Sequence, residues 1–379
     1  MSKPHIVFLV AEDWYFCLHW LPVAGAVRDA GYRVTVVTKV DQHADEIQTA
    51  GLTLAPFDLG RGRFNPATET ARVFRLARLL RRLKPDLTHH IGIKAIATGS
   101  YAARQAGVGA SINLFAGLGY LFASEQRRVR ALRKVLRPLL AGPLKYRYSR
   151  VETLNQDDCD RLAADGWIDP ERTTVLPGSG IDLERFTPMP PPENAVVTLA
   201  VVARMIRIKG IDLIVEAVRR AQAAGTPCRL LLVGKPDPAN PSSYSVDDLQ
   251  TWGSLPGIEW RGYVEDVRTI WQEADIAILA SHGGEGVPVT LLESSACCRP
   301  AIATNTPGCR DIVLNNSTGL LVEPDNLLSL VDAAQVLVAD KKKRLRFGLA
   351  SRHLVETRFT SHRVASMILQ DYDCLGLEP

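Results

Sequence analysis

HIVFLVAEDWYFCLHWLPVAGAVRDAGYRVTVVT, residues 5–38, decides the fold class of this chain. Its two ends, HIVFLV and RVTVVT, are short apolar or β-branched runs, a pattern typical of buried strands. Between them, residues 18–32 carry apolar side chains at helical spacing and reach Gly31, where a helix can end. A strand, a helix and a second strand in this order predict a βαβ unit with parallel strands.

The same alternation continues outward from this unit. It restarts after a Pro-rich stretch, FTPMPPPENA (186–195), which suits a linker between domains. The expected helices are residues 67–84, 95–107, 209–225 and 266–274, and the expected strands are residues 86–92, 110–115, 196–204, 228–234, 258–264 and 275–280. The sequence therefore predicts an α/β protein of two doubly wound parallel-sheet domains, residues 1–188 and 189–360, whose carboxyl strand ends face a central cleft.

The composition is that of a globular protein. Of 379 residues, 46% are hydrophobic and 23% are charged, and the mean hydropathy is close to zero. No apolar run reaches the about 18 residues that a membrane helix needs, and the first apolar run is too short for a signal peptide. Seven cysteines without a CxxC pair indicate buried, reduced thiols rather than a disulfide framework or a zinc site. These features predict a cytosolic protein.

The charge is uneven along the chain. Residues 61–150 contain 19 Lys and Arg but 3 Asp and Glu, although the whole chain carries a net charge of +4. This surplus predicts a basic face on the first domain. Within RRVRALRKVLRPLL (127–140), the apolar stripe is Val129, Leu132, Leu136 and Leu139, and the basic stripe is Arg130, Arg133, Lys134 and Arg137. We expect this helix to rest on an anionic membrane surface or, alternatively, to pack on its own domain with a solvated basic face.

A dinucleotide fingerprint is absent after the first strand. The segment AEDWYFCLHW (11–20) contains no glycine, and GLGYLF (117–122) has only part of the G-x-G-x-x-G pattern and lies elsewhere. This absence disfavours a nicotinamide or flavin enzyme.

Three features gather in the second domain, and two of them are loops. In VARMIRIKG (202–210), Arg204 ends a strand and Lys209 starts the next helix, and two cations at a helix N-terminus suit a diphosphate. A solvated loop with ordinary basic residues explains this pair equally well on its own. In SHGGEGVPV (281–289), three glycines let the backbone approach a ligand, and Pro288 is tolerated near a helix start because its missing N–H needs no partner there.

The third feature is a pair of carboxylates, Glu285 and Glu293. If the helix starts near Val287, Glu285 precedes its first turn and Glu293 lies about two turns in. A carboxylate accepts hydrogen bonds from two vicinal hydroxyls, which a hexose or a ribose presents. The pair therefore suits a sugar nucleotide. The alternative is that Glu285 favours the helix N-terminus electrostatically and Glu293 faces solvent.

Together these residues resemble the retaining glycosyltransferases of family 4, whose signature is a Glu, seven residues and a second Glu at an E-G-x-P helix start. The segments that follow one another in family order are LPGSGIDLERF (176–186), VARMIRIKGIDLIVEAV (202–218), LLLVG (230–234), RGYVEDVRTIWQEADIAILAS (261–281), EGVPVTLLESSACCRPAIATNTPGCRDIV (285–313) and TGLLVEP (318–324). The resemblance implies the GT-B architecture of two Rossmann-like domains, an N-terminal one for the acceptor and a C-terminal one for a nucleotide-sugar donor. It also implies that the last helix, about 361–379, packs back on the N-terminal domain.

The resemblance implies roles for individual residues. Arg204 and Lys209 would hold the donor's diphosphate and stabilise the leaving nucleotide, Glu285 would contact the donor sugar, and Glu293 would bind the ribose. The rest of the implied donor site consists of Gly286, Val287, Pro288 and Val289 against sugar and phosphate, and of Gly234, Gly262, Tyr263 and Val264 beside the base. In retaining members the donor's own phosphate is thought to take the acceptor proton, so no general base is implied.

The acceptor side resembles a bacterial subgroup that extends lipid-linked sugars, including N-acetylgalactosaminyltransferases acting on undecaprenyl-diphosphate sugars. The segment that carries this resemblance is NLFAGLGYLF (113–122), with Gly117 and Gly119, where many relatives carry a histidine. His19, His89 and His90 near strand ends are further acceptor-side candidates, although a lone histidine is more often structural. The segment after the first strand departs from the Gly-Gly loop of many relatives.

We expect no metal and no other cofactor. Asp-x-Asp pairs occur in DCD (158–160) and DYD (371–373), both on apparent helices, and the resemblance implies metal independence. The expected function is transfer of a hexose or N-acetylhexosamine from a UDP- or GDP-sugar to a polyprenyl-diphosphate-linked acceptor in bacterial glycan assembly, at the inner face of the cytoplasmic membrane. The alternatives are a nucleotide-sugar epimerase or a transferase to a soluble acceptor on the same fold and, more remotely, a nucleic-acid-binding protein, which the lack of interleaved aromatics disfavours.

Overall fold

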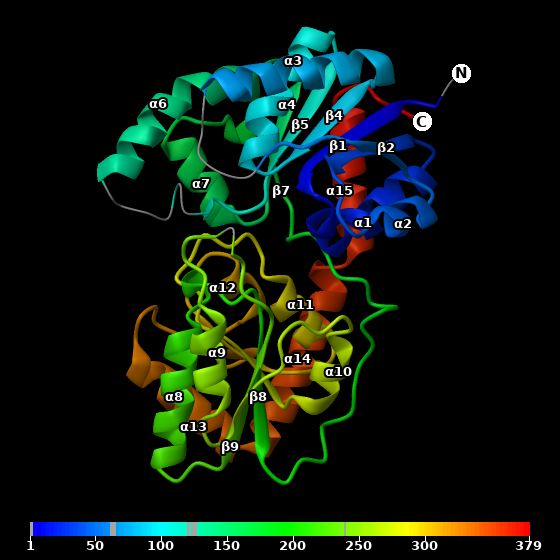
Figure 1. Cartoon of the computed structure of the whole chain (residues 1–379). Coiled ribbons are helices and arrows are strands. Elements are labelled where there is room, and N and C mark those ends of the chain that lie inside the picture. The colour runs from blue at the N-terminus through cyan, green and yellow to red at the C-terminus, as the bar shows by residue number, and fades with distance from the viewer. Residues whose placement is uncertain (1–2, 61–65, 120–121, 123–126, 239) are drawn as a thin grey trace. The chain divides into compact units, whose positions relative to one another are not determined.

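The computed structural model describes residues 3–60, 66–119, 122, 127–238 and 240–379 of this chain (Figure 1). The chain divides into two compact units. The first contains Met1–Gly180 and Ser361–Pro379, and the second contains Ile181–Thr360. Each unit is a parallel β-sheet covered by helices, which confirms the α/β class expected from the sequence.

The described part of the first unit is built on a seven-stranded sheet in the order β3-β2-β1-β4-β5-β6-β7. Its strands are β1 (His5–Glu12), β2 (Arg33–Lys39), β3 (Thr53–Pro56), β4 (Leu87–Ile91), β5 (Ala110–Phe115), β6 (Ser149–Thr153) and β7 (Thr173–Val175). Its helices are α1 (Asp13–Asp29), α2 (Ala44–Thr49), α3 (Pro66–Leu83), α4 (Ile93–Ala106), α6 (Arg127–Leu144), α7 (Gln156–Ala164), η1 (Pro170–Arg172) and α15 (Ser361–Cys374). The strand order reverses at β1, which pairs in parallel with both β2 and β4.

Helix α1 begins directly after β1, at Asp13, rather than at residue 18 as predicted. The buried Asp13 carboxylate accepts hydrogen bonds from the amides of Trp14 at 2.7 Å, Asp41 at 2.6 Å and His43 at 3.1 Å. Burial opposes ionisation, but these hydrogen bonds outweigh it and lower the pKa of Asp13. The start of α1 thus holds a carboxylate of the protein itself, which disfavours a second anion there.

Helix α15 completes the core of the first unit. Asp371 accepts a hydrogen bond from Arg150 on β6 at 2.7 Å and from Thr174 on β7 at 2.8 Å. The fully buried Tyr372 places its hydroxyl 3.2 Å from Nδ1 of His89 on β4. The last helix is therefore bound to three strands that lie far from it in the sequence.

Helices α3, α4 and α6 form one layer over the first sheet, and they fall within the basic segment 61–150 (Figure 1). On α6, Leu136 packs against a buried cluster that includes Leu140, Leu144 and Trp167. The side chains of Leu132 and Leu139 lie outside the described residues. The exposed basic residues of α6 are Arg127, Arg130, Lys134 and Arg137. Leu136, Leu140 and Leu144 of α6 thus pack on their own domain while its basic side chains are exposed, as in the alternative considered above.

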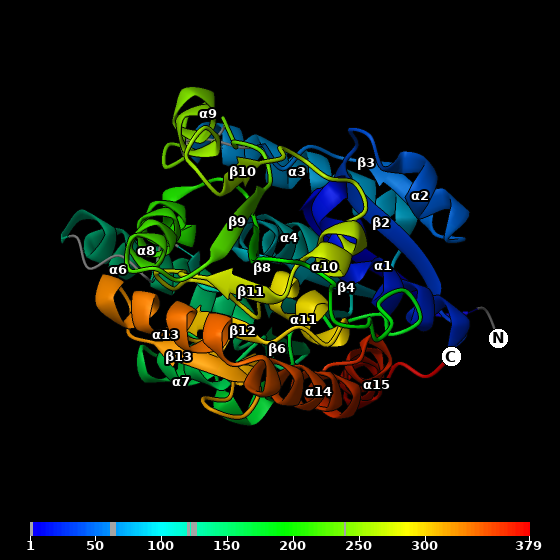
Figure 2. The same ribbon diagram turned by 90° about the horizontal axis from the view of Figure 1, so that it is seen from below.

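The second unit is built on a six-stranded parallel sheet in the order β10-β9-β8-β11-β12-β13, and these strands can be followed across the sheet in Figure 2. Its strands are β8 (Val197–Val202), β9 (Cys228–Val233), β10 (Ile258–Trp260), β11 (Ile276–Leu279), β12 (Ala301–Thr304) and β13 (Gly319–Val322). Its helices are η2 (Arg207–Lys209), α8 (Ile211–Ala223), α9 (Val246–Gly253), α10 (Arg268–Glu273), α11 (Val289–Ala296), α12 (Cys309–Ile312), α13 (Leu327–Ala339) and α14 (Lys341–Arg358). The strand order reverses between β8 and β11, which pair with each other.

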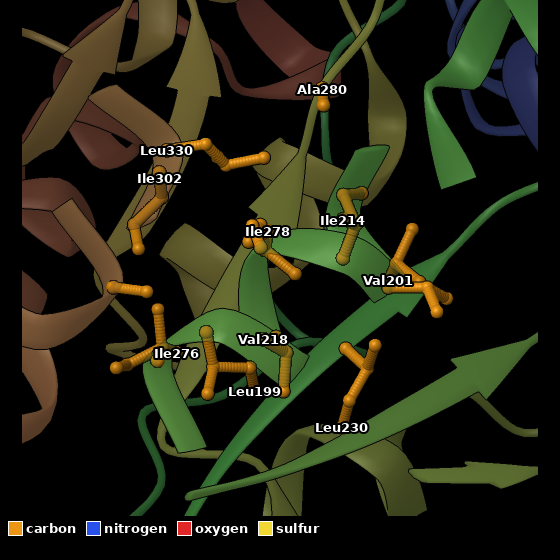
Figure 3. Close-up of a cluster of buried hydrophobic side chains, with 14 of the residues drawn as sticks. Leu199, Val201, Ile214, Val218, Leu230, Ile276, Ile278, Ala280, Ile302 and Leu330 are labelled. Carbon is orange, nitrogen blue, oxygen red and sulfur yellow. The ribbon is translucent and has the colours of Figure 1, made fainter. Parts of the chain in front are cut away.

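The core of the second unit lies between this sheet and helices α8 and α13 (Figure 3). Ile214 and Val218, one turn apart on α8, pack with Leu199 of β8 and Ile276 of β11. Full burial of each such aliphatic side chain contributes about 1.5–3 kcal/mol. This packing fixes β8 and β11 side by side, and it thereby fixes the loops that leave their carboxyl ends.

The Pro-rich stretch 186–195 is bonded to the second unit and does not behave as a free linker. Ile181 donates its amide hydrogen to Phe359 O at 2.8 Å, so the unit begins before the predicted residue 189. Arg299 donates hydrogen bonds to the carbonyl oxygens of Met189 at 3.3 Å and Pro190 at 2.8 Å. Proline-rich backbone keeps its carbonyl acceptors although it lacks donors, which explains how a guanidinium can hold it.

Candidate donor-binding site

The loops after β8 and β11 are neighbours because these strands pair where the strand order reverses. In open α/β sheets this point, outside the carboxyl ends of the strands, is where ligands bind. A hydrogen bond joins the loops, since the His282 amide donates to Ile208 O at 2.9 Å, and the Ser281 hydroxyl oxygen lies 3.3 Å from the same carbonyl oxygen. The two loops therefore form one rigid surface.

Lys209 and Glu285 meet on this surface. Nζ of Lys209 lies 2.5 Å from Oε1 of Glu285, and the Ser281 hydroxyl donates to the same oxygen at 3.0 Å. Burial alone would raise the pKa of Glu285, but the charge of Lys209, together with the hydrogen bonds and the charge of Arg204, lowers it below the usual range. The Glu285 side chain is thus a carboxylate with free acceptor capacity beside an ammonium group.

Arg204 lies at the same edge of the sheet but points to a different partner. Its guanidinium NH1 is 2.9 Å from Oδ2 of Asp237, in the loop after β9. Nearly half of the Arg204 side chain is exposed. The guanidinium can therefore turn toward an anion that competes with Asp237.

Two glycines let the site loops touch. A Cβ atom on Gly210 would overlap the carbonyl oxygen of Ala280 at the end of β11, and one on Gly308 would overlap the carbonyl oxygen of Gly286. Both glycines have positive φ angles, 64° and 80°, which favour glycine as well. The close approach of Gly308 fixes the backbone beside Glu285.

Helix α11 begins at Val289, two residues later than predicted, with Pro288 as its N-cap residue. Glu293 is therefore just over one turn into the helix instead of two. Its side chain does not face solvent, because the residue is only 5% exposed. Burial, opposed in part by the charge of Arg185, raises the pKa of Glu293 to about 8. Buried carboxyls with strongly shifted pKa values are enriched at functional sites.

The expected base-binding residues lie at the ends of β9 and β10. Because β10 is only Ile258–Trp260, residues 262–264 form a loop rather than the end of a strand. The Gly234 amide donates to Gly262 O at 2.6 Å, so the two predicted segments are in contact. Tyr263 is 63% exposed, and an exposed aromatic ring at a strand end offers a surface for stacking on a base.

His89 and His90, two acceptor-side candidates, are buried inside the first unit. Neither has any exposed surface, and Nδ1 of His90 lies 2.8 Å from Oδ1 of Asn113. Nε2 of His89 lies 3.2 Å from Oε2 of Glu152 on β6. Burial lowers the pKa of His89 to about 3 and of His90 to about 4, and it raises the pKa of Glu152 to about 8. These histidines are structural parts of the sheet.

The remaining acceptor-side candidates are His19, Gly117 and Gly119. His19 is half-buried on α1, with Nδ1 3.4 Å from the hydroxyl of Ser179. Gly117 and Gly119 follow β5 and have φ angles of 99° and 58°. Among the described residues, no atom lies within 4 Å of a Cβ placed on Gly119.

Over the described ranges, no group of three or more His, Cys, Asp or Glu is placed to hold a metal ion. The two Asp-x-Asp pairs lie on helices α7 and α15.

No helix in the part of the chain that the structure describes is long and apolar enough to cross a bilayer. The seven cysteines are free and five of them are buried, as the sequence predicts.

Sequence reasoning missed four residues of this site, namely Asp237, Ser281, His282 and Asp325. Nδ1 of His282 lies 2.7 Å from Oδ1 of Asp325, in the loop between β13 and α13. His282 could have been suspected, because it directly precedes the glycines of the site loop. Asp237 and Asp325 carry no such signal, since only the folded sheet brings their loops to the same edge.

Two family models match this chain in succession. Residues 5–150 match the model described as glycosyl transferase 4-like, and residues 196–340 match the model described as glycosyl transferases group 1. The second match spans the loops after β8, β9, β11 and β13 that carry the candidate site.

Two bacterial enzymes illustrate the similarity. The N,N'-diacetylbacillosaminyl-diphospho-undecaprenol alpha-1,3-N-acetylgalactosaminyltransferase of Campylobacter jejuni is 24% identical over 93% of this chain and 94% of its own length. The UDP-Gal:alpha-D-GlcNAc-diphosphoundecaprenol alpha-1,3-galactosyltransferase of Escherichia coli is 25% identical over 70% of both chains. The crystal structure of HepE from Anabaena in complex with UDP-glucose is similar in fold, with a TM-score of 0.78, 16% identity and coverage of 98% of this chain and 99% of that one. The chain thus shares the GT-B fold of two Rossmann-like domains.

Proposed function

Because this chain belongs to the glycosyltransferases, with a 4-like domain followed by a group 1 domain, we propose that it transfers a hexose or N-acetylhexosamine from a UDP- or GDP-sugar to a polyprenyl-diphosphate-linked acceptor, with retention of the anomeric configuration. The observation that carries this proposal is the contact of Lys209 with Glu285 where β8 and β11 end. A cation and a carboxylate side by side suit a ligand in which an anionic diphosphate adjoins a hydroxylated sugar.

The donor would lie across the carboxyl ends of the second sheet. Lys209 and Arg204 would bind its diphosphate, and Glu285 would accept hydrogen bonds from hydroxyls of the transferred sugar. The buried Glu293 would accept from the ribose, and Tyr263 would lie against the base. The backbone of residues 286–289, held by the close approach of Gly308, would contact the sugar and the phosphates.

Catalysis in this proposal rests on electrostatic stabilisation by the protein's own cations. As the bond from the anomeric carbon to the donor phosphate breaks, negative charge gathers on the departing diphosphate next to Lys209 and Arg204. The acceptor hydroxyl oxygen bonds to the anomeric carbon on the same face, and its proton passes to the donor phosphate. Neither a metal ion nor a general base from the protein is required for this sequence.

The acceptor is inferred from the relatives. The Campylobacter and Escherichia enzymes are both named for substrates in which a sugar is linked to undecaprenol through a diphosphate. The first of them matches nearly the whole chain, including the N-terminal domain to which the acceptor is assigned. Gly117, Gly119 and His19 are the accessible candidates for acceptor contacts there.

If the acceptor is lipid-linked, the protein would act at a membrane surface. The layer of α3, α4 and α6 carries the basic surplus of the chain and would meet anionic headgroups at the inner face of the cytoplasmic membrane. Phe74 on α3 is 58% exposed, and Arg75 and Arg78 of the same helix are exposed as well. A basic surface with an exposed aromatic residue is suited to the headgroup region.

The test is a donor screen followed by product analysis. Purified protein is incubated with UDP- and GDP-sugars and a synthetic polyprenyl-diphosphate saccharide, and the product is examined by mass spectrometry and by NMR of the new anomeric centre. We expect one lipid-linked product with the donor's anomeric configuration. An epimerised sugar formed from donor alone, an inverted product, or transfer only to soluble saccharides would overturn the proposal.

A further inference from the structure

Each of three basic side chains at the carboxyl edge of the second sheet is paired with a carboxylate. The pairs are Lys209 with Glu285 at 2.5 Å, Arg204 with Asp237 at 2.9 Å and His282 with Asp325 at 2.7 Å. The first two cations are those assigned above to the donor's diphosphate. The third pair has no role in the function proposed so far.

His282, in the loop after β11, is hydrogen-bonded to the turn that contains Lys209. Its amide donates to the carbonyl oxygen of Ile208, the residue before Lys209, at 2.9 Å. The preceding residue, Ser281, donates its hydroxyl hydrogen to Glu285. The His282 side chain is nevertheless 34% exposed, so a ligand at this edge of the sheet can reach the imidazole ring.

Asp325 adopts an unusual backbone conformation to make its contact. Its φ angle is 58°, a left-handed conformation that strains a residue with a Cβ atom and that Asp and Asn tolerate better than most. The helix that follows does not need this carboxylate as a cap, because Asn326 accepts the hydrogen bond from the Ser329 amide at 3.0 Å. Strained residues of this kind cluster at functional sites.

We propose that His282 is a third cationic ligand for the donor's phosphates, and that a phosphate oxygen replaces Asp325 as its partner when the donor binds. The inference rests on the proposed function for the nature of the ligand. The imidazole contacts Asp325, and the His282 amide holds the turn that carries Lys209, so an anion that displaces Asp325 lies in a loop pair that also presents an ammonium group. The donor's diphosphate carries two negative charges and more acceptor oxygens than a single carboxylate, which favours the exchange.

The same exchange explains why the carboxylates are present. With each cation neutralised by a side chain, the loops are stable before the donor arrives, and a singly charged anion gains little by replacing a carboxylate. A diphosphate that contacts all three cations gains enough to displace Asp237 and Asp325. Departure of the nucleoside diphosphate product is assisted when these carboxylates return to their cations.

The experiment is calorimetric titration of UDP and GDP, with uridine and guanosine as phosphate-free controls, at pH 6 and low salt. The proteins are the wild type, His282→Asn, Asp325→Asn and, as a matched control, His353→Asn, which alters an exposed histidine on α14. We expect His282→Asn to weaken nucleoside diphosphate binding by about tenfold or more, the size of a lost charged hydrogen bond. We expect Asp325→Asn to tighten it by about two- to fivefold, since an exposed competing charge is removed and Asn tolerates the same backbone conformation. The control should match the wild type.

The outcomes separate this inference from the proposed function. If wild-type protein binds neither UDP nor GDP, the proposed function itself fails. If one of them binds equally well to the wild type and to His282→Asn, or if Asp325→Asn weakens its binding, the exchange is wrong.

Discussion

Nζ of Lys209 and Oε1 of Glu285 lie 2.5 Å apart although 75 residues separate them in the chain. The contact depends on three features of the fold. Strand β8 pairs with β11, and the missing Cβ atom of Gly210 lets the loop after β8 approach the carbonyl oxygen of Ala280. The Ser281 hydroxyl donates a hydrogen bond to the Glu285 carboxylate. A substitution at either residue therefore changes the site's charge without removing a core side chain.

Glu285→Gln should lower kcat by about 100-fold or more, while the affinity for the nucleoside diphosphate stays nearly unchanged. The reason is that in the proposed function the carboxylate would contact the transferred sugar, and an interaction that strengthens in the transition state affects turnover rather than nucleotide binding. Steady-state kinetics and nucleotide titration measure the two effects. Glu216→Gln, on the exposed face of α8, is the matched control. A normal kcat in Glu285→Gln would remove Glu285 from the catalytic site.

Glu293→Gln should weaken binding of the bare nucleoside diphosphate by about 1.5–3 kcal/mol, as expected for a hydrogen bond to a charged group. The pKa of Glu293 is raised to about 8, so near pH 7 the carboxyl must release a proton to accept two hydrogen bonds from a ribose. Nucleotide affinity of the wild type should therefore rise with pH toward 8 and level off above it. Titrations in buffers of different ionisation enthalpy should detect the released proton. An identical pH dependence in Glu293→Gln would contradict the ribose contact.

Gly308→Ala should destabilise the second domain by more than the roughly 1–2 kcal/mol of a left-handed alanine, because its Cβ atom would also overlap the carbonyl oxygen of Gly286. Activity should fall with it, since the same backbone lies beside Glu285. Gly225→Ala is the control: its φ angle is also positive, but its Cβ atom would meet no other described atom within 4 Å. Thermal unfolding compares the two variants. Equal losses of stability would show that the close approach at Gly308 is unimportant.

Glu152→Gln should make folding stability less sensitive to pH. Glu152 is fully buried, and its folded-state pKa is raised to about 8, whereas an unfolded Glu titrates near about 4.3. Between these values the folded state binds a proton that the unfolded state has released, so wild-type stability falls as the pH rises from about 4 to about 8. Glutamine removes this contribution beside His89 and Asp371. Melting temperatures between pH 5 and pH 9 give the slopes, with the exposed Glu171→Gln as the control. Parallel slopes for wild type and Glu152→Gln would refute the prediction.

Charge reversal on α3, as Arg75→Glu with Arg78→Glu, should reduce co-sedimentation with vesicles rich in anionic lipid. Both side chains are exposed next to Phe74, and each cation near an anionic surface contributes about 1 kcal/mol to binding. The control reverses Arg219 and Arg220, which are exposed on α8 of the second domain. Wild-type binding that is indifferent to the anionic lipid content would remove the membrane contact altogether.

The fold was readable from the sequence because strands of a parallel sheet are buried on both faces and form continuous apolar runs. The residues at which helices begin were harder to predict from the sequence. Helix α1 begins five residues before the predicted start, at Asp13, whose carboxylate accepts hydrogen bonds from the amide of Trp14 in the first turn and from the amides of Asp41 and His43 in a later loop. Helix α11 begins late because Pro288 takes the N-cap position with an extended backbone.

The sequence predicts those residues of the candidate site whose positions follow from local spacing. It does not predict those whose positions depend on partners far away in the chain. The loops of Lys209 and Glu285 could be placed at strand ends from the βαβ rhythm alone. His89 and His90 could not be assigned to the core, because their burial results from helices on both faces of β4 and from partners on β5 and β6. Neighbouring residues of a strand point to opposite faces, so both histidines are enclosed only when both helical layers are in place.

Helix α15 has a consequence for biosynthesis. A ribosome releases residues 1–180 long before it releases Asp371 and Tyr372, with the whole second domain in between. Until then Arg150 lacks its carboxylate partner, and α1 lacks the helix that packs against it. The N-terminal domain therefore cannot complete its folding until α15 has been synthesised. The C-terminal domain can fold as it emerges, because its residues are contiguous in the chain. A stop codon that removed only the last nineteen residues would leave every residue of the second unit in the chain and would remove α15 from the first.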